Sequence, residues 1–515
     1  MTRCFSLAGP IVARLVAASA LVLVGLAMPR TAAAQEGIAP IPSPTAPRDE
    51  ILIDVGMVPG RLDLGRLVQE LERTWLVTPD PAARARAVPT VASAISAWFR
   101  ADFAGVARGL VVAEAQLRRG EGPTAGDLWA GSVMVWPGDR VIAPGDPLPI
   151  VFGHAFPIAE EIAAGSAEVT VEVAGVSRTF PAPLPAPASP GSLDVIPEIR
   201  LPPDARGDLP VTIRIVAGGR TRTIPEWITV SENAKERLGA LRGTIAASRP
   251  SLERETARGI ESRLFALELG MQPELPFPVE AELARAERLA AAAAAGERAL
   301  ELAAPGDRWL RLPVEIGGTA CRIRVPPEAA AGARPLLLIA HGMGGSEHMF
   351  FEAHGDGLAA RLAAARGWIV AAPSFGAALG GAEIGEIVTA LEGFLPIDPE
   401  RIFLLGHSLG AMRIVSAAAK EPNRYRALAP LSGGGVLPAG AKLEGLPCFL
   451  AAGDQDFGKG MTFTLEGALE RAGAKVTLKM YEPSEHLLMV VDCLEDVFRF
   501  FDEAAAKPRI VPASE

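Results

Sequence analysis

From residue 309 onward, short apolar runs alternate with segments that have the pattern of helices. The runs lie at residues 336–340, 368–372, 402–405, 428–431, 448–452 and 476–481. Strands that are apolar along their whole length are buried on both faces, so this alternation predicts a mostly parallel sheet with helices on both faces. A hairpin, formed by residues 310–314 and 321–325 around two glycines, is expected to precede the series. We therefore expect an α/β domain over residues 306–515.

One of these strands runs into a motif of the form G-x-S-x-G. The strand is followed by the sequence GHSLG at residues 406–410, and residues 411–420 have a composition compatible with a helix. The two glycines permit a sharp turn that a Cβ atom would obstruct, so the hydroxyl of Ser408 is expected to stand above the sheet at the start of the next helix. Ser408 is therefore the candidate nucleophile.

The sequence also offers a base and an acid for this serine. A serine hydroxyl is a weak nucleophile and needs a base within hydrogen-bond reach, which is itself oriented by an acid. Two later strands lead to Asp454 and Asp456 and then to His486, in the chain order Ser, Asp, His. We expect His486 to be the base, and we favour Asp456 as its partner because it lies further into the loop than Asp454. Glu485 is expected to face solvent.

Acyl transfer further requires two N–H donors aimed at the developing oxyanion. Leu409 follows the nucleophile directly and supplies one backbone N–H if the turn is formed. The strand at residues 336–340 ends in the glycine-rich sequence HGMGG, and we assign the second donor to the backbone of Met343. His341 then has a structural role.

No cofactor and no metal are expected. His341, His348 and His354 lie close together in the sequence, but no pattern of carboxylates or cysteines accompanies them. No C-x-x-C pair offers a structural zinc site either.

Taken together, residues 309–507 resemble the catalytic domain of α/β hydrolases. Within that fold, the sequences HGMGG, IDPERI and GHSLG resemble the branch of dienelactone hydrolases, polyhydroxybutyrate depolymerases and feruloyl esterases. The resemblance implies Ser408 as the nucleophile, His486 as the base and Asp456 as its partner. Many members of the branch have a second glycine where this chain has Ala411, a departure that should not remove activity.

Three functions remain open on these residues. The first is an exported serine esterase that acts on a small-molecule or polymer-linked ester. The second is a secreted peptidase or amidase that uses the same groups, as in enzymes similar to prolyl oligopeptidases. The third is a non-catalytic binding protein. Because the segment 432–447 is too short for a helical cap, we expect a site that is open to solvent. Access to it would then be limited by the glycine-rich turn after residue 340, by the loop at residues 374–381, or by the N-terminal domains.

Three further regions are expected between the N-terminus and the α/β domain. Residues 35–125 have helical periodicity, in which two stripes stand out: Leu64, Leu67, Val68, Leu71 and Trp75, and then Ile95, Trp98, Phe99, Phe103 and Val106. We expect the second stripe to face another helix. Residues 126–232 alternate apolar and polar side chains, which predicts a small immunoglobulin-like β-sandwich with a proline-rich loop at residues 181–190. Residues 233–305 are expected to form a helical connector, or a wall over the active site.

The charge and cysteine content exclude other classes of protein. The chain has 50 basic and 60 acidic residues, a net charge of −10, so it lacks the cationic surface that nucleic-acid binding requires. Beyond Cys4, three cysteines remain, at positions 321, 448 and 493. We expect buried free thiols, and a pair between Cys448 and Cys493 stays open.

The first 34 residues have the pattern of an export signal. Arg3 and Arg14 precede an uncharged apolar run over residues 15–28, and three alanines at positions 32–34 follow. The apolar run is shorter than the ~20 residues of a membrane-spanning helix, so we expect a cleaved signal and a secreted or periplasmic protein without stable membrane insertion.

We predict cleavage between Ala34 and Gln35, because small side chains at the last positions of the signal fit a signal peptidase site. N-terminal sequencing of the exported protein checks this. A chain that still carries residues 15–28 would contradict it and indicate a membrane anchor.

Overall fold

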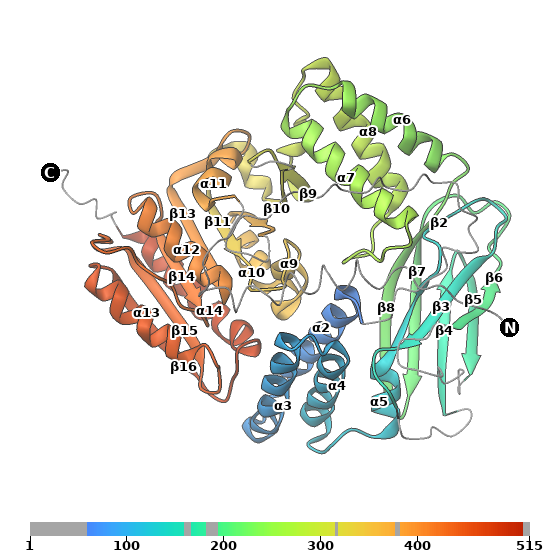
Figure 1. Cartoon of the computed structure of the whole chain (residues 1–515), viewed down its shortest axis with the longest axis horizontal. Helices are drawn as coiled ribbons and strands as arrows, with labels where there is room; N and C mark the ends of the chain where they lie inside the picture. The colour runs from blue at the N-terminus through green and yellow to red at the C-terminus, as the bar shows by residue number, and fades with distance from the viewer. Residues whose placement is uncertain (1–58, 159–165, 182–193, 315–317, 376–381, 508–515) are drawn as a thin grey trace, which may run out of the picture.

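The computed structural model describes residues 59–158, 166–181, 194–314, 318–375 and 382–507 (Figure 1). The expected export signal and the proline-rich stretch at residues 182–190 lie outside the described residues. The C-terminal α/β domain, the helices α2 to α4, two β-sheets and a group of three helices follow one another around the molecule in Figure 1.

The C-terminal strands form one eight-stranded sheet in the order β16-β15-β14-β13-β11-β12-β10-β9. Strand β10 runs antiparallel to both of its neighbours, and the pairings from β12 to β16 are parallel. The strands are β9 (Gly306–Leu312), β10 (Thr319–Val325), β11 (Arg334–Ala340), β12 (Ile369–Pro373), β13 (Ile397–His407), β14 (Ala427–Leu431), β15 (Pro447–Gly453) and β16 (Lys475–Tyr481). The expected hairpin and mostly parallel sheet are confirmed.

Helices cover both faces of this sheet. They are α9 (Met349–Glu352), α10 (His354–Ala364), α11 (Ile384–Glu392), α12 (Leu409–Lys420), α13 (Lys459–Arg471) and α14 (Leu488–Ala506), with a 3₁₀ turn η4 at Pro327–Ala331. Leu336 and Leu338 of β11 belong to one core with α11, α12 and α13, whereas Leu337 and Ile339 belong to the opposite core with α10 and α14. Because side chains alternate along a strand, a continuous apolar run fills both cores.

The N-terminal helices are α2 (Arg61–Val77), α3 (Pro81–Phe99), α4 (Phe103–Arg119) and α5 (Ala125–Ser132). Asp80 and Asp102 cap the N-termini of α3 and α4, and Gly120 ends α4 in the left-handed conformation with φ of 73°. In the stripe of α2, Leu64, Leu67, Leu71 and Trp75 are buried, whereas Val68 is half-buried. These helices share one apolar core with the three-stranded sheet that follows them in the chain.

Two sheets follow, built from eight strands: β1 (Val133–Pro137), β2 (Val141–Ile142), β3 (Leu148–His154), β4 (Ala167–Val173), β5 (Val176–Pro181), β6 (Asp194–Ile199), β7 (Gly207–Ala217) and β8 (Arg220–Val230). The sheet β1-β3-β6 and the sheet β2-β8-β7-β4-β5 share an apolar core. Gly218 and Gly219 turn the β7–β8 hairpin at φ of 57° and 81°, where a Cβ atom would be strained. An immunoglobulin-like arrangement stays a prediction.

Helices α6 (Ala234–Ala247), α7 (Leu252–Glu268) and α8 (Val279–Ala295), with a 3₁₀ turn η3 at Leu300–Leu302, lead into β9. They pack around their own apolar core, which includes Trp309 of β9. A Cβ atom on Gly259 of α7 would lie 2.4 Å from the Trp309 ring, so this helix and β9 touch where the glycine stands.

Two further expectations concern the chain as a whole. Cys321, Cys448 and Cys493 are all free and buried, so Cys448 and Cys493 are not paired. Within the described ranges, no helix combines the length and the apolar character that a membrane crossing requires.

Polar contacts fix helix α2 to the α/β domain. The Glu72 side chain of α2 is fully buried, and its Oε2 accepts a hydrogen bond of 3.1 Å from the backbone N–H of Gly355. Its Oε1 lies 3.4 Å from Nδ1 of the buried His354. One turn on, the indole N–H of Trp75 donates to Asp492 of α14 at 2.9 Å. The buried carboxylate of Glu72 stabilises the protein only when α2 is packed on the α/β domain, because it would lose these partners if the two separated.

We predict that Glu72→Ala lowers the free energy of unfolding by about 1–3 kcal/mol, since it leaves the N–H of Gly355 buried without its acceptor. Chemical denaturation measures the change. The control is Glu121→Ala at an exposed position between α4 and α5, for which we expect less than about 0.5 kcal/mol. Equal effects of the two substitutions would contradict the anchoring role of Glu72.

Candidate active site

Ser408 lies in a tight turn between strand β13 and helix α12. Its φ of 54° and ψ of −114° fall in a region that residues other than glycine rarely adopt. A Cβ atom on Gly406 would lie 2.4 Å from the carbonyl oxygen of Gly410, and one on Gly410 would lie 2.0 Å from that of Ala340. Both glycines are therefore required for the turn. Helix α12 begins at Leu409, so the serine stands at the N-terminus of this helix, where the first N–H groups have no partner within the helix.

His486 and Asp456 lie in the loops that follow β16 and β15. Nδ1 of His486 is 2.8 Å from Oδ1 of Asp456, and both residues are buried. Oδ1 of Asp456 also accepts the backbone N–H of Gly458 at 2.6 Å, which holds the carboxylate in place. Asp454 instead accepts the backbone N–H of Ser484 at 2.8 Å. The structure thus brings Asp456 to His486 and gives Asp454 a loop contact.

Glu485 was expected to face solvent, and this expectation is wrong. The side chain is fully buried at the start of helix α14, where its two oxygens accept the backbone N–H groups of Leu487 and Leu488 at 2.8 Å each. A carboxylate that caps a helix N-terminus satisfies donors that have no partner within the helix. Burial raises the pKa of Glu485 to about 8, and the nearby carboxylates of Asp456 and Glu72 add to the rise.

The glycine-rich turn after β11 lies against the serine. A Cβ atom on Gly342 would lie 3.3 Å from Cβ of Ser408, so the backbone of this turn approaches the nucleophile closely. The turn closes with a hydrogen bond of 3.1 Å from the N–H of Gly345 to the carbonyl of Gly342. The turn that carries Met343 therefore lies against Ser408, and Leu409 follows the serine directly at the start of α12. Their roles as oxyanion donors stay a prediction.

His341 has the structural position that we expected. Its Nε2 accepts the backbone N–H of Phe375 at 2.9 Å, and its Nδ1 lies 2.8 Å from the carbonyl oxygen of Gly342. The Nδ1–H tautomer satisfies both contacts, and burial lowers the pKa of this imidazole. His341 thereby ties the glycine-rich turn to the loop after β12.

The remaining histidines near the serine are buried and do not gather around a metal site. Burial lowers the pKa of His348 to about 4 and that of His407 well below its usual value. Nε2 of His407 lies 2.9 Å from the carbonyl oxygen of His486, and His354 lies beside His407. Among the residues that the structure describes, no group of three or more histidine, cysteine, aspartate or glutamate side chains could hold a metal ion.

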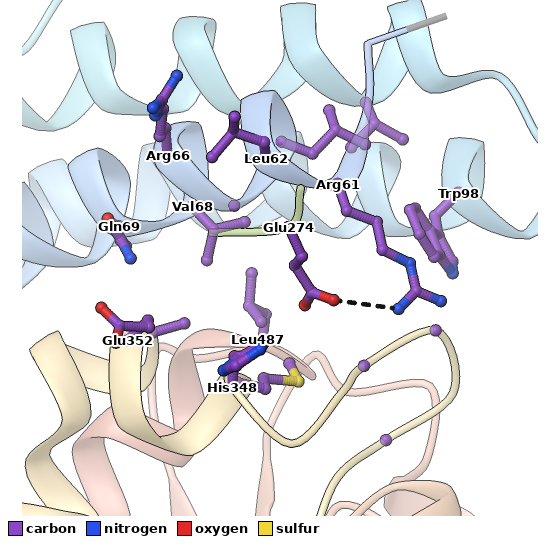
Figure 2. A pocket seen from close by; sticks show the side chains of 18 of the residues that line it. Arg61, Leu62, Arg66, Val68, Gln69, Trp98, Glu274, His348, Glu352 and Leu487 are labelled. Carbon is purple, nitrogen blue, oxygen red and sulfur yellow. Dashed lines mark hydrogen bonds and ion pairs between the residues drawn. The ribbon is translucent and has the colours of Figure 1, made fainter. Parts of the chain in front are cut away.

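Ser408 and His486 line a cavity of about 440 Å³. Figure 2 shows other residues of its lining, among them Val68, Trp98 and His348. Its roof is formed by α2 and α3, a side by Trp227 of β8, and part of its wall by residues 274–276 after α7. The site is less open than expected, because N-terminal helices, one of the three elements expected to limit access, line the cavity above the serine. The alternative of a wall contributed by residues 233–305 holds for the short segment 274–276.

Two neighbouring residues of α3 contact the site directly, and sequence reasoning missed this. A Cβ atom on Gly344 would lie 2.3 Å from the ring of Trp98, so Trp98 packs on the glycine-rich turn. Phe99 meets Phe457 edge to face with ring centroids 5.5 Å apart, and the ring centroid of Phe457 lies 4.1 Å from that of the His486 imidazole. The second stripe is expected to face another helix, and Trp98 does pack edge to face on Phe103 of α4, with ring centroids 5.2 Å apart. Trp98 and Phe99 also contact the α/β domain. The sequence signal for this contact was the pair of aromatic residues at the end of the helix. Such a pair indicates a contact but not the element that it packs against.

Residues 336–510 match the family model described as "Alpha/beta hydrolase family". Together with the strand order, this makes the C-terminal part of the chain an α/β-hydrolase domain. No curated protein matches the chain with significance.

Several solved structures resemble part of the chain. An S-formylglutathione hydrolase from Agrobacterium tumefaciens is 15% identical with a TM-score of 0.34, and the match covers 38% of this chain and 94% of that one. The fluorophosphonate-binding serine hydrolase F of Staphylococcus aureus is 15% identical, TM-score 0.32, covering 39% and 100%. Est1E from Butyrivibrio proteoclasticus is 17% identical, TM-score 0.30, covering 39% and 100%. At these scores the likenesses carry no argument about function.

Burial of Glu485 predicts a pH-dependent stability. Because folding raises the pKa of this carboxyl from 4.5 to about 8, the folded chain holds a proton here that the unfolded chain releases. The contribution is fully present below pH 4.5 and is lost as the pH rises to about 8. Thermal unfolding across this range should show a decline that Glu485→Gln reduces. An identical decline in the variant would contradict the assignment.

Proposed function

We propose that this chain is an exported serine hydrolase that cleaves carboxylic esters. The observation that carries the proposal is the contact of 2.8 Å between His486 Nδ1 and Asp456 Oδ1, beside a serine on a strained turn that lines the same cavity as the histidine. A buried carboxylate on Nδ1 leaves Nε2 free to act on the serine hydroxyl.

In the proposed reaction, Oγ of Ser408 attacks the ester carbonyl carbon while His486 takes the hydroxyl proton. Backbone N–H groups of Met343 and Leu409 stabilise the oxyanion, and His486 returns the proton to the departing alcohol. Water then attacks the acyl-enzyme by the same route and releases the acid. Asp456 holds the imidazole in the tautomer that this sequence needs, and no step requires a metal or a cofactor.

A peptidase or amidase would use the same groups, but the cavity favours an ester. The carboxylates that could hold a peptide's charged N-terminus already have partners, since Glu274 pairs with Arg61 and Glu352 pairs with Arg322. Cleaving an amide needs a poor leaving group to be protonated in tight register, which depends on extended binding of the substrate.

The export of the enzyme is part of the proposal and rests on the pattern of the first 34 residues alone. The substrate is a small-molecule or polymer-linked ester. The low content of cationic surface argues against a nucleic-acid partner.

We predict that Ser408→Ala and His486→Ala each lower kcat/KM toward p-nitrophenyl acetate by several orders of magnitude, and that Asp456→Asn costs about 10⁴-fold. The matched control is Asp454→Asn, whose amide oxygen can still accept the N–H of Ser484, so we expect a change within a few-fold. A crippling Asp454→Asn with a mild Asp456→Asn would reverse the assignment of the acid.

We also predict that p-nitrophenyl esters are cleaved much faster than p-nitroanilides with the same acyl group. The reason is that an activated ester leaves readily with the triad and the oxyanion hole alone. Steady-state kinetics on matched pairs measure the ratio. If peptide anilides reach a kcat/KM equal to that of the esters, the esterase proposal fails in favour of a peptidase.

A further inference from the structure

The cavity above Ser408 has walls from two parts of the chain that are far apart in sequence. Figure 2 shows Val68 and Trp98 on the helical side, and His348 and Leu487 on the side of the α/β domain. A volume of about 440 Å³ lies within the range of sites that enclose small organic molecules. The space is therefore sufficient for a substrate group larger than acetyl.

Much of the helical wall is apolar, and it is incompletely packed. Val68, Ile95 and Trp98 are only half-buried although they lie between two units of the protein, because they face the cavity. Gly65 of α2 also lines the cavity, and a Cβ atom placed on it would meet nothing within 4 Å. Glycine inside a helix is less stable than alanine by roughly 1 kcal/mol, and here it leaves the space empty.

The charged groups at the cavity are balanced by partners. Arg61 pairs with Glu274 at 3.5 Å, a contact drawn in Figure 2. Arg66 pairs with the buried Glu226 at 2.6 Å. Burial lowers the pKa of His348 to about 4, so this imidazole is neutral near pH 7. A charged acyl group would find no free group of opposite charge among these residues, so its burial in the cavity would be unfavourable.

One end of the cavity is exposed. Phe457, which packs on the imidazole of His486, is 56% exposed, and Phe99, which itself lines the cavity, is 45% exposed. The leaving alcohol receives its proton from His486 and must depart before water attacks, so it belongs beside this exposed pair. The acyl group stays bound through both half-reactions, and the enclosed cavity suits it.

We propose that helices α2 and α3 form an acyl-binding wall that selects neutral, apolar acyl groups longer than acetyl, with Gly65 and Val68 setting the length that fits. This inference rests on the proposed esterase function. It makes the N-terminal helices part of the active site.

The test uses the full chain and two series of esters. The first series is p-nitrophenyl esters from acetate to decanoate, and the second is acetate esters of methanol and octanol. Gly65→Phe and Val68→Phe fill the cavity from α2. Gly239→Phe is the matched control, because Gly239 lies in α6, away from the cavity, and a Cβ atom there also meets nothing within 4 Å. Circular dichroism establishes that each variant is folded.

For the unaltered chain we expect kcat/KM to rise about fourfold per added methylene until the cavity is full, as burial of each methylene implies. Gly65→Phe and Val68→Phe should lower kcat/KM toward the octanoate ester at least tenfold more than toward the acetate ester. The control should keep the original profile. The kcat/KM of the two variants toward octyl acetate should not show this loss. A monosuccinate ester, which carries a charge on the acyl group, should be a worse substrate than the butyrate ester.

Folded variants that keep the original chain-length profile would overturn the inference. A loss of kcat/KM confined to octyl acetate would also overturn it, because it would place the alcohol in the cavity. Binding of methyl octanoate to Ser408→Ala, measured by calorimetry, separates this from failure of the esterase proposal. Suppose that the unaltered chain hydrolyses no ester, but that Ser408→Ala binds methyl octanoate and adding Gly65→Phe abolishes this binding. That outcome would support the apolar binding site and reject the proposed ester hydrolysis. Absence of binding together with a flat chain-length profile would reject the acyl-binding wall.

Discussion

Strand β11 and helix α12 approach so closely at Gly410 that a side chain there would collide with the backbone of Ala340. This contact depends on the sharp turn at Ser408, whose positive φ is maintained only because the surrounding strands and helix leave no alternative. The same approach places the glycine-rich turn beside the serine. The loops after β15 and β16 then bring Asp456 and His486 to the same edge of the sheet.

The α/β domain alone leaves this edge uncovered, and helices α2 and α3 complete it. Helix α2 is anchored through Glu72 and Trp75, while α3 ends with Trp98 on the glycine-rich turn. The anchor and the cavity wall are therefore parts of the same helices. A chain with this arrangement can shape its substrate pocket without an insertion in the α/β domain, because the covering elements come from the N-terminal region.

Much of the catalytic domain could be predicted from the sequence, because its signals are local. Continuous apolar runs indicate strands with two buried faces, and two glycines around Ser408 indicate a turn without room for side chains. The position of Asp456 followed from its place in the loop. The N-terminal region could be named as one possible limit on access, but the sequence could not show which helices cover the serine, since a stripe such as the one that contains Trp98 indicates a buried face and not what it packs against. Glu485 was assigned to solvent because carboxylates are rarely buried, and only the position of two N–H groups at the start of α14 explains its burial.

The central claim is that Ser408 is a nucleophile activated by His486. Treatment of the folded chain with a fluorophosphonate, followed by peptide mass mapping, tests it most directly because the reagent reacts with activated serines and needs no knowledge of the substrate. The account predicts one adduct, on Ser408, and strongly reduced labelling of His486→Ala. A folded chain that acquires no adduct, or one that is labelled elsewhere while Ser408 stays unmodified, would contradict it.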